Sequence, residues 1–455
     1  MKKTFMGVRL KRLREERGLT QIALARALEL SASYLNQLEQ NQRPLTVPVL
    51  LKLNAVFGVD VQLFSEDDEA RLISDLREVL ADVPDGESVA LAEIRELAAN
   101  MPAVARTLLG LARRQRAGQG KPMPFEEVRD FFYARHNHVA EIDELAERLS
   151  TSWLLRTGDA ADGLEKRLTD AHGIRVVRGN WHDGGGPASE TQRRFDAKQK
   201  LLTLSPHLNT GQAAFQMATQ LAFLEATPLI DALVDQARLS GDEARRLARI
   251  GLANYFAGAL ILPYGQFLDQ AERLRYDIEL LGRSFGVGFE TTCHRLSTLQ
   301  RPEARGVPFF FVRVDRAGNI SKRQSATDFH FSRIGGTCPL WNVYEAFAQP
   351  GRILTQLAAM PDGRAYLWLA RTVSRGYGGF GAPSKTFSVG LGCDLRHAER
   401  LVYSQGLDLK AAEGFTPIGT GCKVCPRSHC PQRAFPPSGN TLIVDENRRH
   451  FSPYA

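Results

Sequence analysis

The chain has 455 residues, of which 43% are hydrophobic and 24% are charged, and its formal net charge is +7. That length is enough for about three domains with separate cores, and the basic balance suits a polyanionic partner. No apolar run reaches the roughly 18 residues that a membrane-spanning helix needs. The first residues lack the apolar segment and cleavage site of a secretory leader, so a cytoplasmic protein is expected.

The first segment, residues 1–65, is predicted to be a bundle of short helices. Thr20 and Ser31 stand where the N-caps of two successive helices belong, and Leu24 and Leu35 lie at helical spacing from other apolar residues. Two short helices joined by a tight turn predict a helix-turn-helix, whose second helix enters the major groove of DNA. A helical protein-interaction module is the alternative.

This pattern resembles the phage-repressor-like (XRE) helix-turn-helix family. The resemblance implies that the start of the second helix faces base edges, where glutamine can pair with adenine and small side chains leave room for a thymine methyl group. Phosphate contacts are implied for Gln21 and for Asn41 or Arg43. The implied DNA-binding residues are Gln21, Ala32, Ser33, Tyr34, Gln37 and Arg43.

Residues 66–122 are predicted to be a helical linker that carries oligomer contacts. Acidic residues open its first helix, and Pro-Asp-Gly and Gly-Gln-Gly sequences interrupt it. One helix-turn-helix covers a single operator half-site, so a homodimer or homotetramer is expected on a palindromic operator.

Residues 123–300 are predicted to be mainly helical. Two of their helices, Ala213–Phe223 and Ala253–Pro263, resemble the paired helices of the ImmA/IrrE metallopeptidase-like domain. In that family the first helix carries His-Glu-x-x-His, whose histidines bind zinc and whose glutamate activates water. The matching positions here are Thr219, Gln220 and Phe223, none of which can do this chemistry. The resemblance therefore implies a zincin-like domain without zinc, and no peptidase activity is expected.

Residues 301–455 are predicted to form a C-terminal domain for ligand binding and a metal cluster, with a β-hairpin that starts near Pro308. The whole arrangement resembles the short-chain fatty acyl-CoA regulators, through the segments 126–133 and 336–343 and the cysteine-rich end. The fold expected is mainly α with an α+β C-terminal part. The function implied is a transcription regulator of propionate- or acetate-type acyl-CoA metabolism, controlled by an acyl-CoA effector.

An acyl-CoA site needs cations for the phosphates, an aromatic ring for adenine and an apolar slot for the acyl group. Cations on the helix before the hairpin and just after its turn are candidate phosphate contacts, and aromatic residues on the second peptidase-like helix are candidates for the slot. Core packing and solvated charges are the alternative interpretations. The candidate ligand-binding residues are Tyr255, Tyr264, Arg295, Lys322 and Arg323.

Three of the six cysteines lie within nine positions, as Cys422, Cys425 and Cys430. Thiolates at this spacing in a reducing compartment indicate a metal centre. Irregular spacing beside prolines favours a [4Fe-4S] cluster, with zinc as the alternative. The fourth ligand is expected to be Cys393, with Cys338 as the nearest alternative and His397 or His429 as others. Two other functions stay open: a regulator whose input is the redox state of the cluster, and a metallopeptidase that cleaves a repressor.

Overall fold

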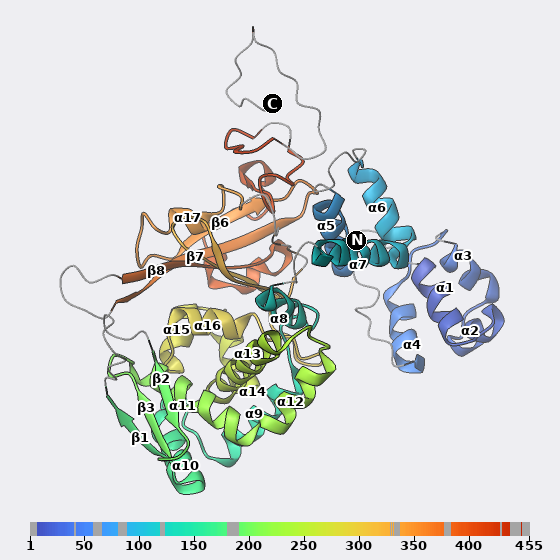
Figure 1. Ribbon diagram of the computed structural model, residues 1–455. Helices are drawn as coiled ribbons and strands as arrows, with labels where there is room; N and C mark the ends of the chain where they lie inside the picture. Colours follow the sequence, from blue (N-terminus) through green and yellow to red (C-terminus); the bar gives the residue numbers. More distant parts are fainter. Residues whose placement is uncertain are drawn as a thin grey trace. The chain divides into compact units, whose positions relative to one another are not determined.

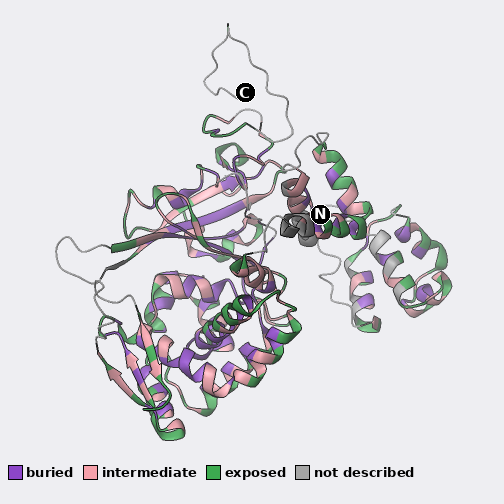
Figure 2. Cartoon of the chain, in the orientation of Figure 1, coloured by how far each residue is buried: buried purple, intermediate pink, exposed green. Residues whose placement is uncertain are grey.

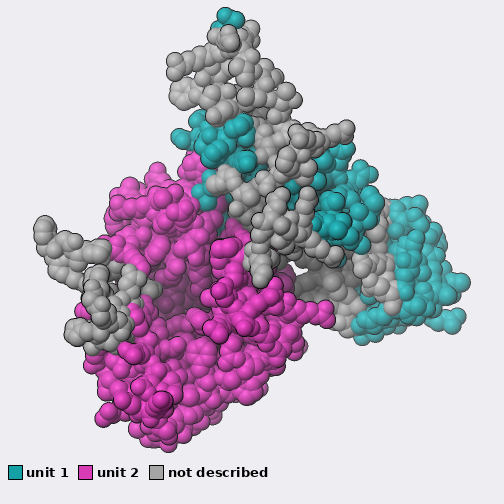
Figure 3. All heavy atoms as spheres, in the orientation of Figure 1, with its two compact units in different colours: residues 1–121, 328–337, 420–455 teal, residues 122–327, 338–419 magenta. Residues whose placement is uncertain are grey.

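The computed structural model describes two compact units (Figures 1 and 3). Unit 1 comprises residues 1–121, 328–337 and 420–455, and unit 2 comprises residues 122–327 and 338–419. Within these units the structure describes residues 7–40, 42–57, 66–80, 89–118, 123–179, 191–327, 329, 331, 337–376, 384–427, 430–436 and 447.

Unit 1 contains two helical clusters, each with its own apolar core. The first has helices α1 (Gly7–Glu16), α2 (Gln21–Ala27), α3 (Ala32–Glu39) and α4 (Val47–Phe57). Its core consists mainly of leucines, among them Leu10, Leu24, Leu28, Leu35, Leu38 and Leu53. The second has α5 (Glu66–Leu80), α6 (Leu91–Asn100) and α7 (Pro102–Gly118), which pack through Leu72, Leu76, Ile94, Ala98, Ala105 and Leu109. The predicted helical segment at 66–122 is therefore present.

Unit 2 begins with helices and a small sheet. The helices are α8 (Pro124–Tyr133), α9 (Ala140–Ser152), α10 (Ala161–His172), α11 (Thr210–Glu225), α12 (Thr227–Gln236), α13 (Asp242–Ile261), α14 (Tyr264–Arg273), α15 (Ile278–Ser284) and α16 (Phe289–Leu296). The sheet has the order β1-β3-β2, from β1 (Arg175–Arg178), β2 (Arg193–Asp196) and β3 (Leu201–Leu204). Strand β3 runs parallel to β1 and antiparallel to β2. The β-branched residues at positions 174–177 of the sequence indicate β1, whereas no comparable pattern marks β2 or β3.

The second sheet of unit 2 has six strands in the order β5-β4-β8-β7-β6-β9. They are β4 (Phe310–Val314), β5 (Ile320–Ser325), β6 (Leu354–Ala359), β7 (Ala365–Gly376), β8 (Ser384–Asp394) and β9 (Thr416–Pro417), and β9 is parallel to β6. The expected hairpin is the β4–β5 pair. Short helices α17 (Asn342–Glu345), η2 (Leu395–Arg400), η3 (Val402–Ser404) and η4 (Ala412–Gly414) complete the unit.

One apolar core runs through the helices and the second sheet of unit 2. It joins residues of α11 and α13, such as Leu221 and Phe256, to sheet residues such as Phe311 and Leu391. Figure 2 shows this burial along α13 and through β7 and β8, and Figure 1 shows α15 and α16 beside the sheet. The division predicted at residue 300 therefore falls inside a continuous core.

No single helix among the described residues combines the length and the apolar character of a membrane span. Only α11 and α12 together meet that test, by length and composition, and they are bent by 78° at their junction.

Gly392 on β8 illustrates how closely the second sheet is packed. Its register partners are Phe310 on β4 and Trp368 on β7, whose rings lie 4.6 Å apart between centroids. A Cβ atom at residue 392 would stand 2.1 Å from the Phe310 ring. The side chain of an aromatic residue thus occupies the space above a strand glycine.

We expect Gly392→Ala to lower the free energy of unfolding by about 1–3 kcal/mol, because the Phe310 ring must leave its place. The control is Gly258→Ala on α13, where a Cβ atom would meet nothing within 4 Å. A glycine inside a helix destabilises it, so the control should gain about 0.5–1 kcal/mol. Urea unfolding measures both, and equal stability of the two variants would contradict the packing described for β8.

Candidate DNA interface, effector site and cysteine loop

Helices α2 and α3 form the expected helix-turn-helix. The Thr20 hydroxyl accepts a hydrogen bond from the Ala23 N–H at 3.1 Å, and the Ser31 hydroxyl accepts one from the Tyr34 N–H at 3.1 Å. These side chains satisfy backbone donors at the starts of the helices. Glu29 has φ 52°, a left-handed conformation that turns the chain between α2 and α3. The predicted caps are confirmed.

The start of α3 is exposed, as a recognition helix requires. Ala32 and Ser33 are exposed, and Tyr34 and Gln37 are half-buried. The guanidinium of exposed Arg43 lies 5.7 Å from the centre of the Tyr34 ring. Five of the six implied DNA contacts therefore lie on α3 or just after it. Asn41 lies outside the described residues.

Gln21 has a different role from the one implied. Its amide nitrogen donates to Glu39 Oε2 at 3.0 Å and to Asn36 Oδ1 at 3.2 Å. Glu39 is 5% exposed and also accepts from Arg14 Nε at 2.7 Å. Both Gln21 donors are thus in use, and a phosphate, which needs a donor, would have to compete with Glu39. Gln21 therefore ties α2 to α3 and is no longer among our candidate phosphate contacts.

Replacing Gln37 with alanine is expected to weaken operator binding by about 1–3 kcal/mol, the usual contribution of one good side-chain–base pair. The matched control is Gln236→Ala, which removes an exposed glutamine at the end of α12 in unit 2. Fluorescence anisotropy with labelled operator DNA measures the effect. Equal affinities of the two variants would show that Gln37 does not read a base.

The two peptidase-like helices pack against each other, as the resemblance implies. Asn209 and Gln212 form a capping box at the start of α11, and Thr219 donates to the Phe215 carbonyl at 2.8 Å. Thr219 also lies 3.5 Å from Asn254 Oδ1 on α13. Gln220 is 5% exposed, and its amide forms no hydrogen bond with a described residue. A peptidase would need two histidines and a glutamate on this face of α11.

Arg193 on β2 lies against the same face of α11. Its guanidinium is 5.6 Å from the centre of the Phe223 ring and donates to the Gln216 carbonyl at 3.3 Å. Burial lowers the pKa of Arg193, and no described carboxylate pairs with it. A desolvated cation therefore stands beside a residue that replaces a zinc ligand, and it favours an anionic group. Arg193 is not among the residues predicted from the sequence, because no sequence pattern marks β2.

Three of the five candidate ligand-binding residues are engaged in an internal network around Asp143. Arg295 donates to both Asp143 oxygens at 2.8 and 2.9 Å, and the Tyr255 hydroxyl donates to Oδ2 at 2.7 Å. Tyr264 is fully buried and hydrogen-bonds to the backbone of Arg301 and Ala304. These side chains therefore stabilise unit 2, and their polar groups are already engaged within the protein.

Asp143 itself is fully buried. Burial raises its pKa, but the charge and hydrogen bonds of Arg295, together with the Tyr255 hydroxyl, outweigh burial and hold the pKa below the usual value of 3.8. Burial lowers the pKa of the neighbouring His138, which keeps this imidazole neutral. Within the part of the chain that the structure describes, Asp143 is therefore the one carboxylate paired with Arg295.

Lys322 and Arg323 lie side by side on β5 and point to opposite faces of the sheet, because side chains alternate along a strand. Lys322 pairs with Arg313 in the register, and its ammonium is 6.0 Å from the centre of the Phe311 ring. Burial lowers the pKa of Lys322 to about 8. The two residues are unsuited to bind one phosphate together, and Lys322 is the better candidate because no described carboxylate lies within ion-pair distance.

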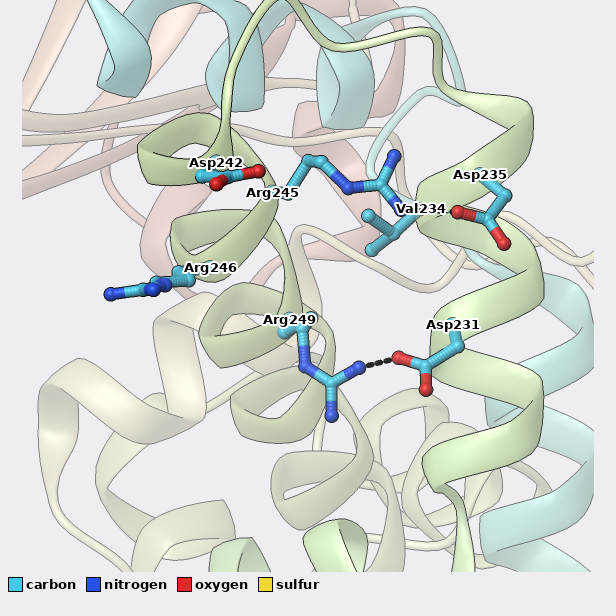
Figure 4. A pocket seen from close by; sticks show the side chains of 7 residues that line it. All are labelled: Asp231, Val234, Asp235, Asp242, Arg245, Arg246 and Arg249. Atoms are coloured by element: carbon cyan, nitrogen blue, oxygen red, sulfur yellow. Dashed lines mark hydrogen bonds and ion pairs between the residues drawn. The ribbon is translucent and has the colours of Figure 1, made fainter.

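A hollow of about 480 Å³ lies between α12 and the start of α13 (Figure 4). Arg249 pairs with Asp231, and Arg245 pairs with Asp235, across the two helices. Arg246 points away from these pairs. The guanidiniums of Arg245 and Arg249 both have carboxylate partners on α12. We therefore interpret the hollow as a contact between two helices that salt bridges hold together, and not as the effector site.

The three clustered cysteines lie on one loop of unit 1, which we call the cysteine loop (residues 420–436). Cys422 and Cys425 are buried and Cys430 is half-buried. The Cys422 sulfur accepts a hydrogen bond from the Ala434 N–H at 3.2 Å. Among the described residues, which leave out Ser428 and His429, no three His, Cys, Asp or Glu side chains converge as metal ligands would.

The other two candidate thiols lie in unit 2. Cys393 on β8 is fully buried in the main core beside Leu367 and Leu391, and burial raises its pKa. A thiol that resists ionisation among apolar side chains is typical of a packing residue. The sulfur of Cys338 accepts a hydrogen bond from the Gly419 N–H at 3.4 Å. The environment of Cys393 thus argues against the role of fourth ligand.

The capped α2–α3 pair with its exposed recognition helix defines a DNA-binding transcription regulator. Family models match residues 10–64 (helix-turn-helix), 169–297 (IrrE N-terminal-like domain) and 298–454 (short-chain fatty acyl coenzyme A regulator, C-terminal). The HTH-type transcriptional regulator PrpR of Mycobacterium tuberculosis is 52% identical over 100% of this chain and 96% of its own. The chain therefore belongs to the short-chain fatty acyl coenzyme A regulator family.

Other relatives agree with this assignment. The HTH-type transcriptional regulator RamB of Mycobacterium tuberculosis is 51% identical over 100% of this chain and 99% of its own. The propionyl-CoA carboxylase regulator of Cereibacter sphaeroides is 43% identical over 99% of this chain and 98% of its own. A solved Mycobacterium tuberculosis transcriptional regulator superposes with a TM-score of 0.70 at 55% identity, over 73% of this chain and 100% of its own. The expected fold class and regulatory function are confirmed.

Proposed function

We propose that this chain is a cytoplasmic regulator that binds a palindromic operator as a homodimer or homotetramer and changes its DNA affinity when a short-chain acyl-CoA binds in unit 2. The observation that carries the proposal is the altered face of α11. Thr219, Gln220 and Phe223 stand where zinc chemistry would need His, Glu and His, and Arg193 lies against Phe223. Such a face binds an anionic ligand and does not activate water.

The groups along this face suit one part of an acyl-CoA. The Gln220 amide is a donor for a carbonyl oxygen, and the Arg193 guanidinium is a donor for a carboxylate, phosphate or polarised thioester. Phe223 adds an apolar wall. Lys322 is a further candidate contact for the phosphates of the ligand, because Glu290, the carboxylate that acts on its charge, is already paired with Arg313. Peptidase activity is not expected from these residues.

Self-association is supported by unit 1. Met101, Val104 and Leu111 are exposed by 50%, 54% and 55%, and Leu108 lies between them, half-buried. Their spacing of three, four and three residues starts at Met101, just before α7, and continues along one face of α7, which is the spacing that a helix presents to a partner helix. A second copy of the chain would cover this face and bring two recognition helices to two half-sites.

We also propose that the cysteine loop holds a metal centre, a [4Fe-4S] cluster or in its place zinc. Cys422, Cys425 and Cys430 would be its ligands, and the donor set of three thiols fits either metal. Such a centre would crosslink the loop rigidly. In the alternative function, a redox-responsive regulator, its redox state would be the signal that changes DNA binding. Because Cys393 packs in the core of unit 2, we expect Cys393→Ser to retain the metal that Cys430→Ser loses.

A thermal-shift screen of the full chain against acetyl-, propionyl- and butyryl-CoA, free CoA and long-chain acyl-CoA tests the effector proposal. A ligand at 100 times its Kd stabilises the protein by about 2.7 kcal/mol, which is readily measured as a rise in Tm. We expect short-chain thioesters to raise Tm more than free CoA does. No shift with any thioester would refute the effector proposal.

A further inference from the structure

Arg433 lies in the cysteine loop, three residues after Cys430. It is 7% exposed, and it donates hydrogen bonds to the carbonyl oxygens of all three loop cysteines. Its guanidinium donates to the Cys422 carbonyl at 3.4 Å and to the Cys425 carbonyl at 3.1 Å, and its backbone N–H donates to the Cys430 carbonyl at 3.2 Å. One residue thus connects the backbone at all three thiols.

Further contacts complete this arrangement. The guanidinium also donates to the carbonyls of Arg427 and Phe435. The next residue, Ala434, donates its N–H to the Cys422 sulfur. On α5, Arg77 donates to the Val424 carbonyl, inside the first turn of the loop. The path of the loop is therefore set by hydrogen bonds to its carbonyls, with the Arg433 guanidinium at their centre.

No carboxylate among the described residues forms an ion pair with Arg433. Among the described residues, the guanidinium donates to neutral carbonyls alone, and its buried Nε has no hydrogen-bond partner. A buried cation is destabilising by several kcal/mol unless an anion or many dipoles compensate it. Residues 420–436 contain no Asp or Glu, but they contain Lys423, Arg427 and Arg433. The groups in the loop that can become negative are therefore its thiols.

We propose that Arg433 closes the cysteine loop and supplies the buried positive charge that balances a thiolate-ligated metal centre. This inference rests on the proposed metal centre. In this role Arg433 is a positioning residue: it contacts the backbone of the ligands and not the metal. The role needs both the forked shape and the charge of arginine, because its two terminal nitrogens reach the separate carbonyls of Cys422 and Cys425 and place the charge within the loop.

The test compares variants of the full chain, purified without oxygen and titrated with Co²⁺, whose thiolate bonds give a charge-transfer absorption. Arg433→Gln removes the fork and the charge, and Arg433→Lys keeps the charge alone. The matched control is Lys423→Gln, which removes a half-buried positive charge from the same loop and leaves the hydrogen bonds of Arg433 to the carbonyls in place. Cys430→Ser shows that the absorption comes from the loop.

We expect Arg433→Gln to weaken Co²⁺ binding about 10- to 100-fold, as loss of an outer-shell partner does. Arg433→Lys should recover part of the loss, and Lys423→Gln should bind like the unchanged chain. Equal affinity of Arg433→Gln and Lys423→Gln would overturn the proposal, and so would full recovery by a neutral substitution such as Arg433→Met. Far-UV circular dichroism checks that the fold of the rest is unchanged.

Hydrogen exchange of peptides from residues 420–436, without metal, separates this inference from the metal proposal. If the unchanged chain shows no thiolate absorption with Co²⁺, the metal centre is refuted and the charge-balancing role falls with it. The loop-closing role is then decided by exchange alone: Arg433→Gln should lose protection that Lys423→Gln keeps. Unchanged protection in Arg433→Gln would refute that role as well.

Discussion

Replacing Asp143 with alanine is expected to lower the free energy of unfolding of unit 2 by about 3–5 kcal/mol, the usual result when one partner of a buried ion pair is removed. The Arg295 side chain is 3% exposed and would keep its charge without an anion. The Tyr255 hydroxyl would lose its acceptor as well. Urea unfolding at neutral pH, followed by intrinsic fluorescence, measures the effect.

The same helix provides a matched control for Asp143. Glu147, one turn further along α9, pairs with Arg301 at 2.7 Å, but the two side chains are 28% and 27% exposed. Glu147→Gln keeps an acceptor for the Gly265 N–H and should change stability by no more than about 1 kcal/mol. A double variant, Asp143→Leu with Arg295→Met, should recover most of the loss. Equal losses in Asp143→Ala and Glu147→Gln would contradict the account of this network.

The lowered pKa of Asp143 fixes the sign of its pH dependence. A carboxyl group whose pKa is lower in the folded state contributes its stabilisation fully above its unfolded-state pKa, here 3.8, and loses it as the pH falls through the lower folded value. The stability difference between the unchanged chain and Asp143→Asn should therefore be constant near neutral pH and shrink only in strong acid.

Replacing Arg193 with glutamine is expected to weaken the binding of short-chain acyl-CoA by about 1.5–3 kcal/mol, the range for hydrogen bonds to charged groups. The free protein should be as stable as before or more stable, because Arg193 is a desolvated cation without a described carboxylate. A loss of affinity without a loss of stability is typical of a binding residue. Isothermal titration calorimetry measures the affinity.

The matched control for Arg193 is its neighbour on β2. Arg194→Gln removes the same charge one position along the strand, where the side chain is exposed and points to the other face. We expect it to bind acyl-CoA like the unchanged chain. If both variants lose the same affinity for acyl-CoA, binding depends only on the overall charge of the protein, and the proposed site on α11 is wrong.

Local signals made part of this molecule predictable from its sequence. Thr20 and Ser31 revealed the helix-turn-helix because a cap, a turn and leucines at helical spacing occur together within a short stretch. The paired helices α11 and α13 were recognised in a different way, from their resemblance to the ImmA/IrrE metallopeptidase-like domain. Short-range rules are enough where the structure depends on neighbours in the chain.

Roles that depend on distant partners were not predictable in this way. Arg295 was expected to contact a ligand phosphate, but it is neutralised by Asp143, 152 positions earlier in the chain. Cys393 was expected to be a ligand, but strand pairing places it in the core. Arg193 and Arg433 were overlooked because an arginine on a strand or in a tail has no pattern of its own. Tertiary burial decides such roles.

The central claim is that acyl-CoA binding in unit 2 controls the affinity of unit 1 for DNA. The direct test is an equilibrium titration of labelled operator DNA with the full chain, alone and with saturating propionyl-CoA or free CoA. Coupling free energies of this kind are about 1–3 kcal/mol, so we expect the acyl-CoA to shift the operator Kd by roughly 5- to 150-fold and Arg193→Gln to abolish the shift. An unchanged operator Kd, in a sample that calorimetry shows to be saturated with propionyl-CoA, would contradict the claim.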